Sequence, residues 1–440
     1  MIWLYRVLFL PLLLLFSPYY LRRMLKRGGY GKDFHYRLGL IKGVPPRRKG
    51  VKRIWIQAVS VGELLAIGPL LSLLDEDDRF EVILTTTTST GYTLARDRYP
   101  TKTVAVGIFP LDFWLFSALA WRRIQPDLVL LMEGERWPEH IHQALKRSIP
   151  IALINARISD RSFSRYFLFP FLGNLLLKPL DLILAATEQD HERLVTLGAN
   201  VENLILTGNL KLDVEIEPQL NREQIHDLIA EMGFVADKNK PEHGMVIFLG
   251  SSTWSNEEEA ILQAFNDALD AGIDCRLLIV PRHAERHREI KSLLESQSLP
   301  FHFRSISKQT PEPVMIYVAD TTGELKLLTQ TADLVFIGKS LPPCDGGQTP
   351  IEAAALGKPL ILGPRTSNFR QICEILIETG AAQRINDVNE LRKVTVELLQ
   401  SKDRRVTMST AARQWHQSNR GATQRTLGEI KKLCYEPDQG

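Results

Sequence analysis

The sequence predicts an α/β protein built from two Rossmann-like domains in tandem. Three observations lead to this fold class: strand-like runs alternate with amphipathic helical patterns, the alternation stops and restarts near the middle, and 440 residues exceed what one compact core usually holds. A balance of 44% hydrophobic and 24% charged residues is typical of a globular chain. Such alternation favours parallel sheets that are covered by helices on both faces.

Each half of the chain contributes its own set of strand-like runs, each followed by a turn and then helical spacing. The pattern loosens between about residues 214 and 243, a polar stretch that contains Pro218 and predicts a connection between domains. No short period repeats, which argues against a solenoid. The runs lie at residues 53–59, 81–88, 127–133, 151–156 and 182–187, and then at 245–253, 275–283, 314–320, 332–340 and 358–364.

The amino-terminal segment is strongly apolar over residues 7–21. As a helix it covers roughly 22 Å, less than the roughly 30 Å hydrocarbon core of a bilayer, and Pro11 and Pro18 disfavour a straight helix. An uncleaved membrane anchor or an interfacial helix is the favoured interpretation, and a buried core helix is the alternative. A cleaved signal peptide fits less well, because no small-residue cleavage site follows.

Charge is distributed unevenly along the chain. The first 53 residues hold 13 Lys or Arg and a single acid, Asp33, whereas the remainder holds 41 basic and 50 acidic residues. Because the basic region trails an apolar segment, it favours an anionic membrane surface as partner, with no nucleic acid. If the segment spans the bilayer, the positive-inside rule places the rest of the chain in the cytoplasm. The four cysteines have no metal-type spacing and suit a reducing compartment.

We therefore divide the chain into four parts. We expect a membrane anchor at residues 1–24, an N-terminal Rossmann-like domain at 25–215, a connection at 216–243 and a C-terminal Rossmann-like domain at 244–440, with the two domains facing a central cleft. In open α/β sheets ligands bind beyond the carboxyl ends of the strands. Functional residues are therefore expected in the loops that follow strands.

Two loops of the first half carry acids directly after a strand, and a third carries a cation. Glu63, in "IQAVSVGELL", lies where a strand ends and a helix begins. A helix dipole stabilises an acid there by about 0.3 to 1 kcal/mol, so position alone leaves a structural and a catalytic role open. Glu133 and Glu135 lie together in "MEGERWPE". Lys211, in "TGNLKLD", is a compact cation suited to a phosphate or carboxylate.

A glycine loop is the most specific motif of the second half. Gly346 and Gly347 in "CDGGQTPIEAAALGKP" let backbone amides approach a ligand closely, and Glu352 lies in the first turn of the next helix. Nucleotide-sugar transferases use this combination to bind a ribose diol through a carboxylate. Arg282 follows another strand in "VPRHAER", whereas helix capping alone explains "GSSTWSNEEE".

Several motifs are missing from the sequence. It has no GxxxxGK[ST] loop for a nucleoside triphosphate and no GxGxxG fingerprint for a dinucleotide. It also has no HExxH, no CxxC pair and no DxD in a loop that follows a strand. We therefore expect no cofactor and no metal site.

At these loops the sequence resembles the 3-deoxy-D-manno-octulosonic acid (Kdo) transferases of lipopolysaccharide biosynthesis, glycosyltransferase family 30. The resemblance covers nearly the whole chain. The matching segments occur in order: "WIQAVSVGE", "MEGERWPE", "INARISDRSF", "TGNLKLD", "GSSTWSNEEE", "VPRHAER", "VADTTGELKLL", "GGQTPIEAAALGKP" and "GPRTSNF".

The resemblance implies a GT-B glycosyltransferase that is inverting and metal-independent and works at the cytoplasmic face of the inner membrane. The donor would be CMP-Kdo and the acceptor lipid IVA, a lipid A precursor. In the family pattern Glu63 is the general base, and Glu133 and Lys211 support the transition state. The residues implied to hold CMP are Pro281, Arg282, Thr322, Gly323, Glu324, Thr349, Pro350, Ile351 and Glu352.

Two departures from the family pattern stand out. Gly134 and Arg136 take the places of Thr and Leu before Trp-Pro, and Gln348 and Thr349 take the places of His and Asn after the two glycines. Two rival functions stay open beside Kdo transfer. One is a GT-B transferase or epimerase that uses a different nucleotide sugar, and the other is a non-catalytic, membrane-tethered binding module.

Overall fold

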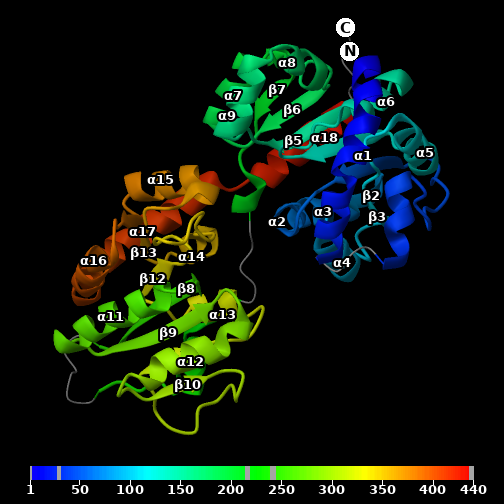
Figure 1. The fold of residues 1–440 in the computed structure, drawn as a ribbon. Coiled ribbons are helices and arrows are strands. Elements are labelled where there is room, and N and C mark those ends of the chain that lie inside the picture. The colour runs from blue at the N-terminus through cyan, green and yellow to red at the C-terminus, as the bar shows by residue number, and fades with distance from the viewer. Residues whose placement is uncertain (1, 27–30, 214–218, 238–243, 436–440) are drawn as a thin grey trace. The chain divides into compact units, whose positions relative to one another are not determined.

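The computed structural model describes residues 2–26, 31–213, 219–237 and 244–435 (Figure 1). The chain forms two compact units: the first comprises Met1–Val214 with Asn419–Gly440, and the second comprises Glu215–Ser418. Each unit contains one sheet of seven parallel strands. The prediction of an α/β protein with two Rossmann-like domains is confirmed.

The first unit has the strand order β3-β2-β1-β4-β5-β6-β7. Residues of β1 (Lys52–Gln57) alternate between two cores: Ile54 and Ile56 pack on one face, Trp55 packs on the other, and all three are fully buried. Because both faces are covered, apolar residues follow one another without a break from Ile54 to Ile56. The strands are β1 (Lys52–Gln57), β2 (Phe80–Thr86), β3 (Ala105–Ile108), β4 (Leu128–Met132), β5 (Ile151–Ala156), β6 (Leu182–Ala185) and β7 (Leu204–Leu206).

Helices surround this sheet (Figure 1). They are α1 (Ile2–Lys26), α2 (Val61–Ala66), α3 (Gly68–Asp75), α4 (Ser89–Arg98), α5 (Trp114–Ile124), α6 (Pro138–Arg147), α7 (Asp160–Leu168), α8 (Phe171–Leu176), α9 (Glu188–Thr196) and α18 (Ala422–Tyr435). Short 3₁₀ turns lie at η1 (Gly31–Leu38), η2 (Val201–Asn203) and η3 (Leu210–Leu212).

The second unit has the strand order β10-β11-β9-β8-β12-β13-β14. Its core joins Phe248 and Phe336 of neighbouring strands to Phe265 of a covering helix. The strands are β8 (Val246–Thr253), β9 (Cys275–Pro281), β10 (Phe301–Phe303), β11 (Ile316–Val318), β12 (Leu334–Ile337), β13 (Leu360–Leu362) and β14 (Ala382–Arg384). The helices are α10 (Arg222–Glu231), α11 (Glu257–Asp270), η4 (Ala284–Arg286), α12 (His287–Glu295), α13 (Leu325–Thr329), α14 (Ile351–Ala355), η5 (Ser367–Phe369), α15 (Arg370–Glu378), α16 (Val388–Gln400) and α17 (Lys402–Asn419).

Four strands were not predicted from the sequence: β3, β7, β10 and β14. Each spans only three or four residues, and each forms the edge of its sheet. An edge strand pairs on one side only and is often short. Such segments carry too few apolar residues to show a strand pattern.

The domain boundaries differ from the predicted ones in two places. The predicted connection at 216–243 contains helix α10, while residues 214–218 and 238–243 lie outside the described part of the chain. The predicted C-terminal domain at 244–440 ends near residue 418 in the structure, because α18 belongs to the first unit.

Hydrogen bonds and apolar packing both attach helix α18 to the first unit. The Asp213 carboxylate accepts the backbone N–H of Gly421 at 2.7 Å and that of Thr423 at 2.5 Å, which satisfies free amides at the start of the helix. Leu427 and Ile430 are buried in the same core as β1. Neither contact produces a pattern that is recognisable in the sequence.

Helix α1 is bonded to buried carboxylates of the first unit. The Arg6 guanidinium donates hydrogen bonds of 2.8 and 2.9 Å to Glu139, a fully buried residue in the first turn of α6. The Tyr5 hydroxyl donates to the buried Asp112 carboxylate at 2.6 Å. The start of α1 is therefore an integral part of this unit.

The apolar part of α1 is bent near Pro11. Within the described residues, no single helix is both long and apolar enough to cross a membrane. The two arms of α1, Ile2–Phe9 and Leu13–Tyr19, pass that test of length and composition only as a pair, bent by 48°.

Arg6→Met should destabilise the protein strongly. The substitution leaves the buried Glu139 charge without its cation, which we expect to cost about 3 kcal/mol and to lower the Tm by about 6 to 12 °C. Thermal unfolding of the full chain in detergent measures the change. Arg48→Met is the matched control, because the exposed Arg48 shares Glu81 with the buried Arg53. Equal shifts for the two variants would contradict the structural role of the Arg6 pair.

Candidate active site

The strand order of the first sheet reverses between β1 and β4. At such a switch point the loops after neighbouring strands diverge and leave a crevice beyond their carboxyl ends. Glu63 lies in the loop and helix that follow β1, and Glu133 directly follows β4. The structure therefore places two of the predicted catalytic residues on either side of this switch point.

Glu63 is buried and bonded to its own helix start. Its carboxylate accepts the backbone N–H of Val59 at 2.7 Å and the Ser60 hydroxyl at 3.2 Å, and Ser60 is the N-cap of α2. Only 8% of the residue is exposed. Burial, followed by the nearby charge of Glu133, raises the pKa of Glu63 to about 7. The capping role and the perturbed pKa therefore coexist in one side chain.

Glu133 and Lys211 form an ion pair at the end of β4. The Lys211 Nζ and the Glu133 Oε1 are 2.5 Å apart. Asn155, at the end of β5, donates its Nδ2 to the same carboxylate at 3.4 Å and accepts the backbone N–H of Leu210 at 3.0 Å. Glu133 and Asn155 both adopt left-handed backbone conformations, with φ of 52° and 50°. Such strain in non-glycine residues is concentrated at functional sites.

Glu135 completes a group of three carboxylates. It accepts a hydrogen bond of 2.6 Å from the Trp137 indole. Burial raises the pKa of Glu135 to about 7, against the opposing effect of Trp137. In the sequence Glu135 lies beside Glu133 with no predicted role of its own, and Asn155 is not among the predicted site residues. The only available signal for Asn155 was its place in the segment "INARISDRSF".

This arrangement suits general-base catalysis beside a cation. A carboxyl group with a pKa near 7 is partly ionised at neutral pH and accepts a proton more readily than an ordinary glutamate. Lys211 supplies positive charge at the same strand ends. A site with these parts can remove a proton from a hydroxyl and stabilise developing negative charge.

The strand order of the second sheet reverses between β8 and β12, and the glycine loop follows β12. Gly346 and Gly347 have φ of 110° and 69°, which side chains rarely adopt. Buried Glu257 holds the start of this loop: its carboxylate accepts the backbone N–H groups of Lys339, Ser340 and Leu341 at 2.7, 2.8 and 3.1 Å. The acidic helix start that we attributed to capping therefore also shapes the glycine loop.

The residues predicted to hold CMP follow β9, β11 and β12, which lie within four adjacent strands. Burial raises the pKa of Glu352, whose nearest cation is Lys326 at 3.8 Å. Arg282 is exposed. The Glu324 carboxylate instead pairs with Arg304, at 2.8 and 2.9 Å, and these hydrogen bonds lower its pKa to about 2. Any nucleotide contact from Glu324 is therefore expected from its backbone.

The other members of the predicted nucleotide set occupy loop and helix-start positions. Pro281 ends β9, and Pro350 is the N-cap of α14. The Thr349 hydroxyl accepts the backbone N–H of Ile351 at 3.3 Å. Thr322 and Gly323 are exposed in the loop after β11, and Gly323 has φ of 89°.

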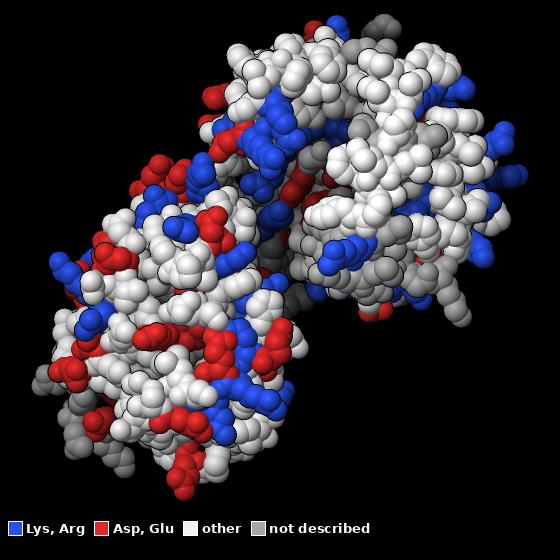
Figure 2. Space-filling model, viewed as in Figure 1, with Lys and Arg blue, Asp and Glu red and all other residues white. Residues whose placement is uncertain are grey.

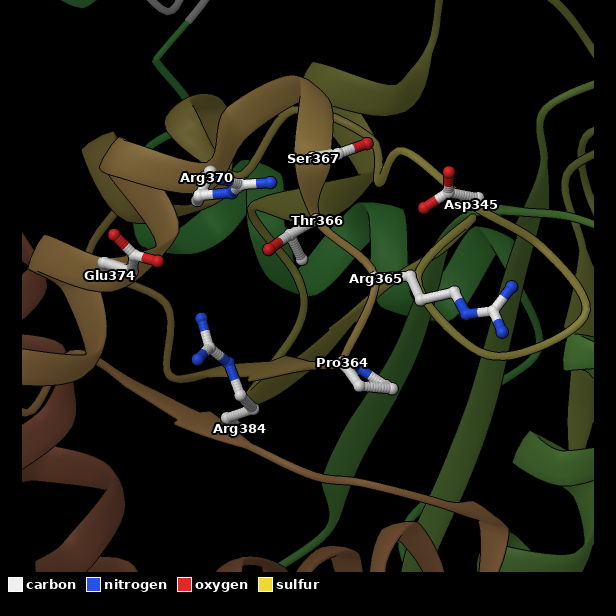
Figure 3. A pocket seen from close by; sticks show the side chains of 8 residues that line it. All are labelled: Asp345, Pro364, Arg365, Thr366, Ser367, Arg370, Glu374 and Arg384. Carbon is white, nitrogen blue, oxygen red and sulfur yellow. The ribbon is translucent and has the colours of Figure 1, made fainter. Parts of the chain in front are cut away.

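An open cavity of about 340 Å³ lies beside the glycine loop (Figure 3). Arg384 lies on its lower side and Arg365 on its right in this view, and Arg370 and Glu374 come from α15. Within the described residues, the guanidinium groups of Arg365 and Arg384 have no ion pair. The cavity thus presents positive charge near the loop that follows β12. The lining residues are Asp345, Pro364, Arg365, Thr366, Ser367, Arg370, Glu374 and Arg384.

The described residues contain no cluster of three or more His, Cys, Asp or Glu side chains that is arranged to hold a metal ion.

Comparison with solved structures identifies the class of fold. The UDP-GlcNAc 2-epimerase from Neisseria meningitidis bound to UDP-GlcNAc has a TM-score of 0.55 at 14% identity, and the match covers 86% of this chain and 100% of that chain. A UDP-N-acetylglucosamine 2-epimerase structure has a TM-score of 0.56 at 15% identity, covering 89% and 98%. At these identities the likeness shows the fold alone, and that fold is the GT-B architecture.

Comparison of sequences identifies the family. The model of the 3-deoxy-D-manno-octulosonic-acid transferases (kdotransferase) matches residues 32–214. The 3-deoxy-D-manno-octulosonic acid transferase of Haemophilus influenzae is 32% identical over 425 residues, covering 96% of this chain and 94% of the relative. That of Bordetella pertussis is 33% identical over 393 residues, covering 86% of each. The chain belongs to the Kdo transferase family of glycosyltransferases.

Glu63→Gln should lower kcat by roughly 10²- to 10⁴-fold. Glutamine keeps one oxygen to accept the Val59 N–H but cannot take a proton, so the Tm should change little. Ser60→Ala is the contrasting variant: it removes the N-cap hydroxyl and should cost about 1 kcal/mol of stability with a far smaller loss of kcat. Turnover of the glutamine variant within about threefold of the parent would exclude proton transfer to Glu63.

The kcat should rise as the pH increases through about 7. The Glu63 carboxyl group has a raised pKa of about 7 and acts as a base only in its deprotonated form, which dominates above that pH. Glu135→Gln removes a neighbouring negative charge that raises this pKa, so the acid limb of the kcat profile should move to lower pH. Profiles of kcat between about pH 5.5 and 9 measure the shift. The exposed Glu192→Gln is the control, and an unmoved limb in Glu135→Gln would refute the coupling.

Proposed function

We propose that this protein transfers Kdo from CMP-Kdo to lipid IVA with inversion of the anomeric centre. The observation that carries this proposal is the buried Glu63, with a pKa near 7, beside the Lys211–Glu133 pair. Membership of the Kdo transferase family supports Kdo as the transferred sugar. The acceptor, the stereochemistry and the cellular location are parts of the proposal.

In the proposed reaction Glu63 takes the proton of an acceptor hydroxyl as that oxygen attacks the anomeric carbon of Kdo. The new bond from carbon to the acceptor oxygen forms as the bond from carbon to the CMP phosphate oxygen breaks. CMP leaves with the electron pair, and attack from the opposite face inverts the carbon. Lys211 supports the negative charge that develops. CMP is a good leaving group, so we propose that the reaction needs no metal ion.

The donor is proposed to bind the second unit. We propose that Glu352, in the first turn of α14, accepts hydrogen bonds from the ribose and that the glycine loop donates backbone amides; the position of Glu352 and the positive φ of both glycines support this. CMP-Kdo carries both a phosphate and a carboxylate. The arginine-lined cavity beside the loop supports the binding of such an anionic donor and has a volume typical of small-molecule sites, about 300 to 1,000 Å³.

The first unit is proposed to contact the inner membrane from the cytoplasmic side. Helix α1 exposes large apolar side chains, with Trp3 73% and Leu15 70% exposed. A second exposed apolar segment, Phe167 to Phe171, links α7 to α8, and Arg165 lies beside it in the sequence. Figure 2 shows largely uncharged surface in this part of the unit, with Lys and Arg side chains nearby. Apolar surface bordered by basic residues is typical of proteins that bind anionic bilayers.

Mass spectrometry tests the proposal directly. Incubation of the protein with lipid IVA and CMP-Kdo should add one Kdo mass for each transfer, and EDTA should leave the yield unchanged. Conversion of a UDP-sugar instead would favour the epimerase or another transferase of the same fold. Ligand binding without release of CMP would favour a non-catalytic, membrane-tethered module. Loss of product with EDTA, restored by Mg²⁺, would refute the metal-free reaction.

A further inference from the structure

The loop that follows β13 carries no residue of the predicted site, although its segment "GPRTSNF" is among those that resemble the Kdo transferases. This loop packs directly on the two glycines of the glycine loop. A Cβ built on Gly346 would lie 2.5 Å from the Asn368 Nδ2, and one built on Gly347 would lie 3.2 Å from the Thr366 Cα. The Asn368 backbone N–H also donates to the Gly346 carbonyl at 2.8 Å. The two loops are therefore in contact, and both contribute residues to the arginine-lined cavity.

The backbone of Arg365 is held by the contacts that also shape the glycine loop. Its N–H donates to the Ser340 carbonyl at 3.1 Å, and the Ser340 N–H donates to the buried Glu257 carboxylate at 2.8 Å. The side chain, by contrast, is exposed, and within the described residues its guanidinium takes part in no ion pair or hydrogen bond. A positioned backbone thus presents a cation that is open to a ligand.

The arginine-lined cavity combines cations with acids. Asp345 and Glu374 line it together with Arg365 and Arg384, and neither acid has an ion pair within the described part of the chain. In Figure 3 Arg384 points toward Glu374, whereas Arg365 lies on the side of Asp345, which belongs to the glycine loop.

This mixture of charges suits a sugar acid better than a phosphate. The phosphodiester of a nucleotide sugar offers only acceptor oxygens, which nearby carboxylates would repel. A sugar acid offers a carboxylate to an arginine and also hydroxyl groups that donate to carboxylates. The cavity therefore fits a ligand that is both an anion and a polyol.

We propose that the arginine-lined cavity binds the sugar of the donor, with the Arg365 guanidinium on the carboxylate of Kdo. The planar guanidinium matches a carboxylate in a bidentate pair. A neutral sugar would leave this cation without its partner, so the contact selects an acidic sugar. The inference rests on the proposed function for the identity of the donor, and it names the residue that distinguishes a sugar acid from other sugars.

The test compares CMP-Kdo with CMP, which has the nucleotide and the phosphate but no sugar. Arg365→Gln should weaken the binding of CMP-Kdo roughly 10- to 100-fold, as expected for the loss of a charge-assisted contact, and leave the binding of CMP unchanged. Calorimetry on the full chain in detergent, without acceptor, measures both affinities. The control is Arg404→Gln, which removes an exposed arginine that pairs with Glu397 and does not line the cavity.

An analogue of CMP-Kdo with a carboxamide in place of the carboxylate isolates the contact. It should bind the parent and Arg365→Gln with similar affinity, and both proteins should have the same Tm, because Arg365 is exposed. Equal losses for CMP and CMP-Kdo would place Arg365 on the phosphate and overturn the assignment. Unchanged binding of CMP-Kdo to Arg365→Gln would also overturn it.

These measurements separate the assignment from the transfer reaction. Because no acceptor is present, a selective loss of CMP-Kdo binding would support the assignment even if transfer to lipid IVA failed. A parent protein that binds CMP but not CMP-Kdo would refute both the proposed donor and this assignment.

Discussion

The Lys211–Glu133 ion pair is the contact on which the first unit's site depends. Lys211 belongs to a turn after β7, an edge strand, whereas Glu133 follows β4 near the centre of the sheet. The pair, together with Asn155, joins segments that are distant in sequence and keeps Glu133 in a left-handed conformation. Strain of this kind persists only where surrounding contacts hold it. The carboxylate that raises the pKa of Glu63 is therefore fixed in place by long-range contacts.

The start of the glycine loop in the second unit is also held by a carboxylate. Glu257 uses one buried carboxylate to bind consecutive backbone amides after β12. Those amides then need no ligand to satisfy them, so the start of the loop is ordered before any substrate arrives. The following glycines retain the open backbone that close approach to a phosphate requires. The buried Glu257 therefore positions the loop that follows β12.

Helix α1 has side chains in two environments: one makes a buried ion pair, and others are exposed to solvent. Its Arg6 side chain neutralises the buried Glu139, while Trp3 and Leu15 are largely exposed. The contact with Glu139 orients the helix on the body of the unit, and the Arg6 guanidinium that makes it also lies over the exposed ring of Trp3, 4.9 Å from the ring centroid. Removal of the whole segment therefore removes a buried ion pair as well as apolar surface.

The fold class, the longer strands and most of the loops that carry the candidate site residues can be predicted from the sequence. Buried parallel strands read as apolar runs, and glycines and acids directly after them are local features. The tertiary structure decided what depends on distant segments: the edge strands, the return of α18 to Asp213, the pairing of Glu324 with Arg304, and the roles of Asn155 and Glu257.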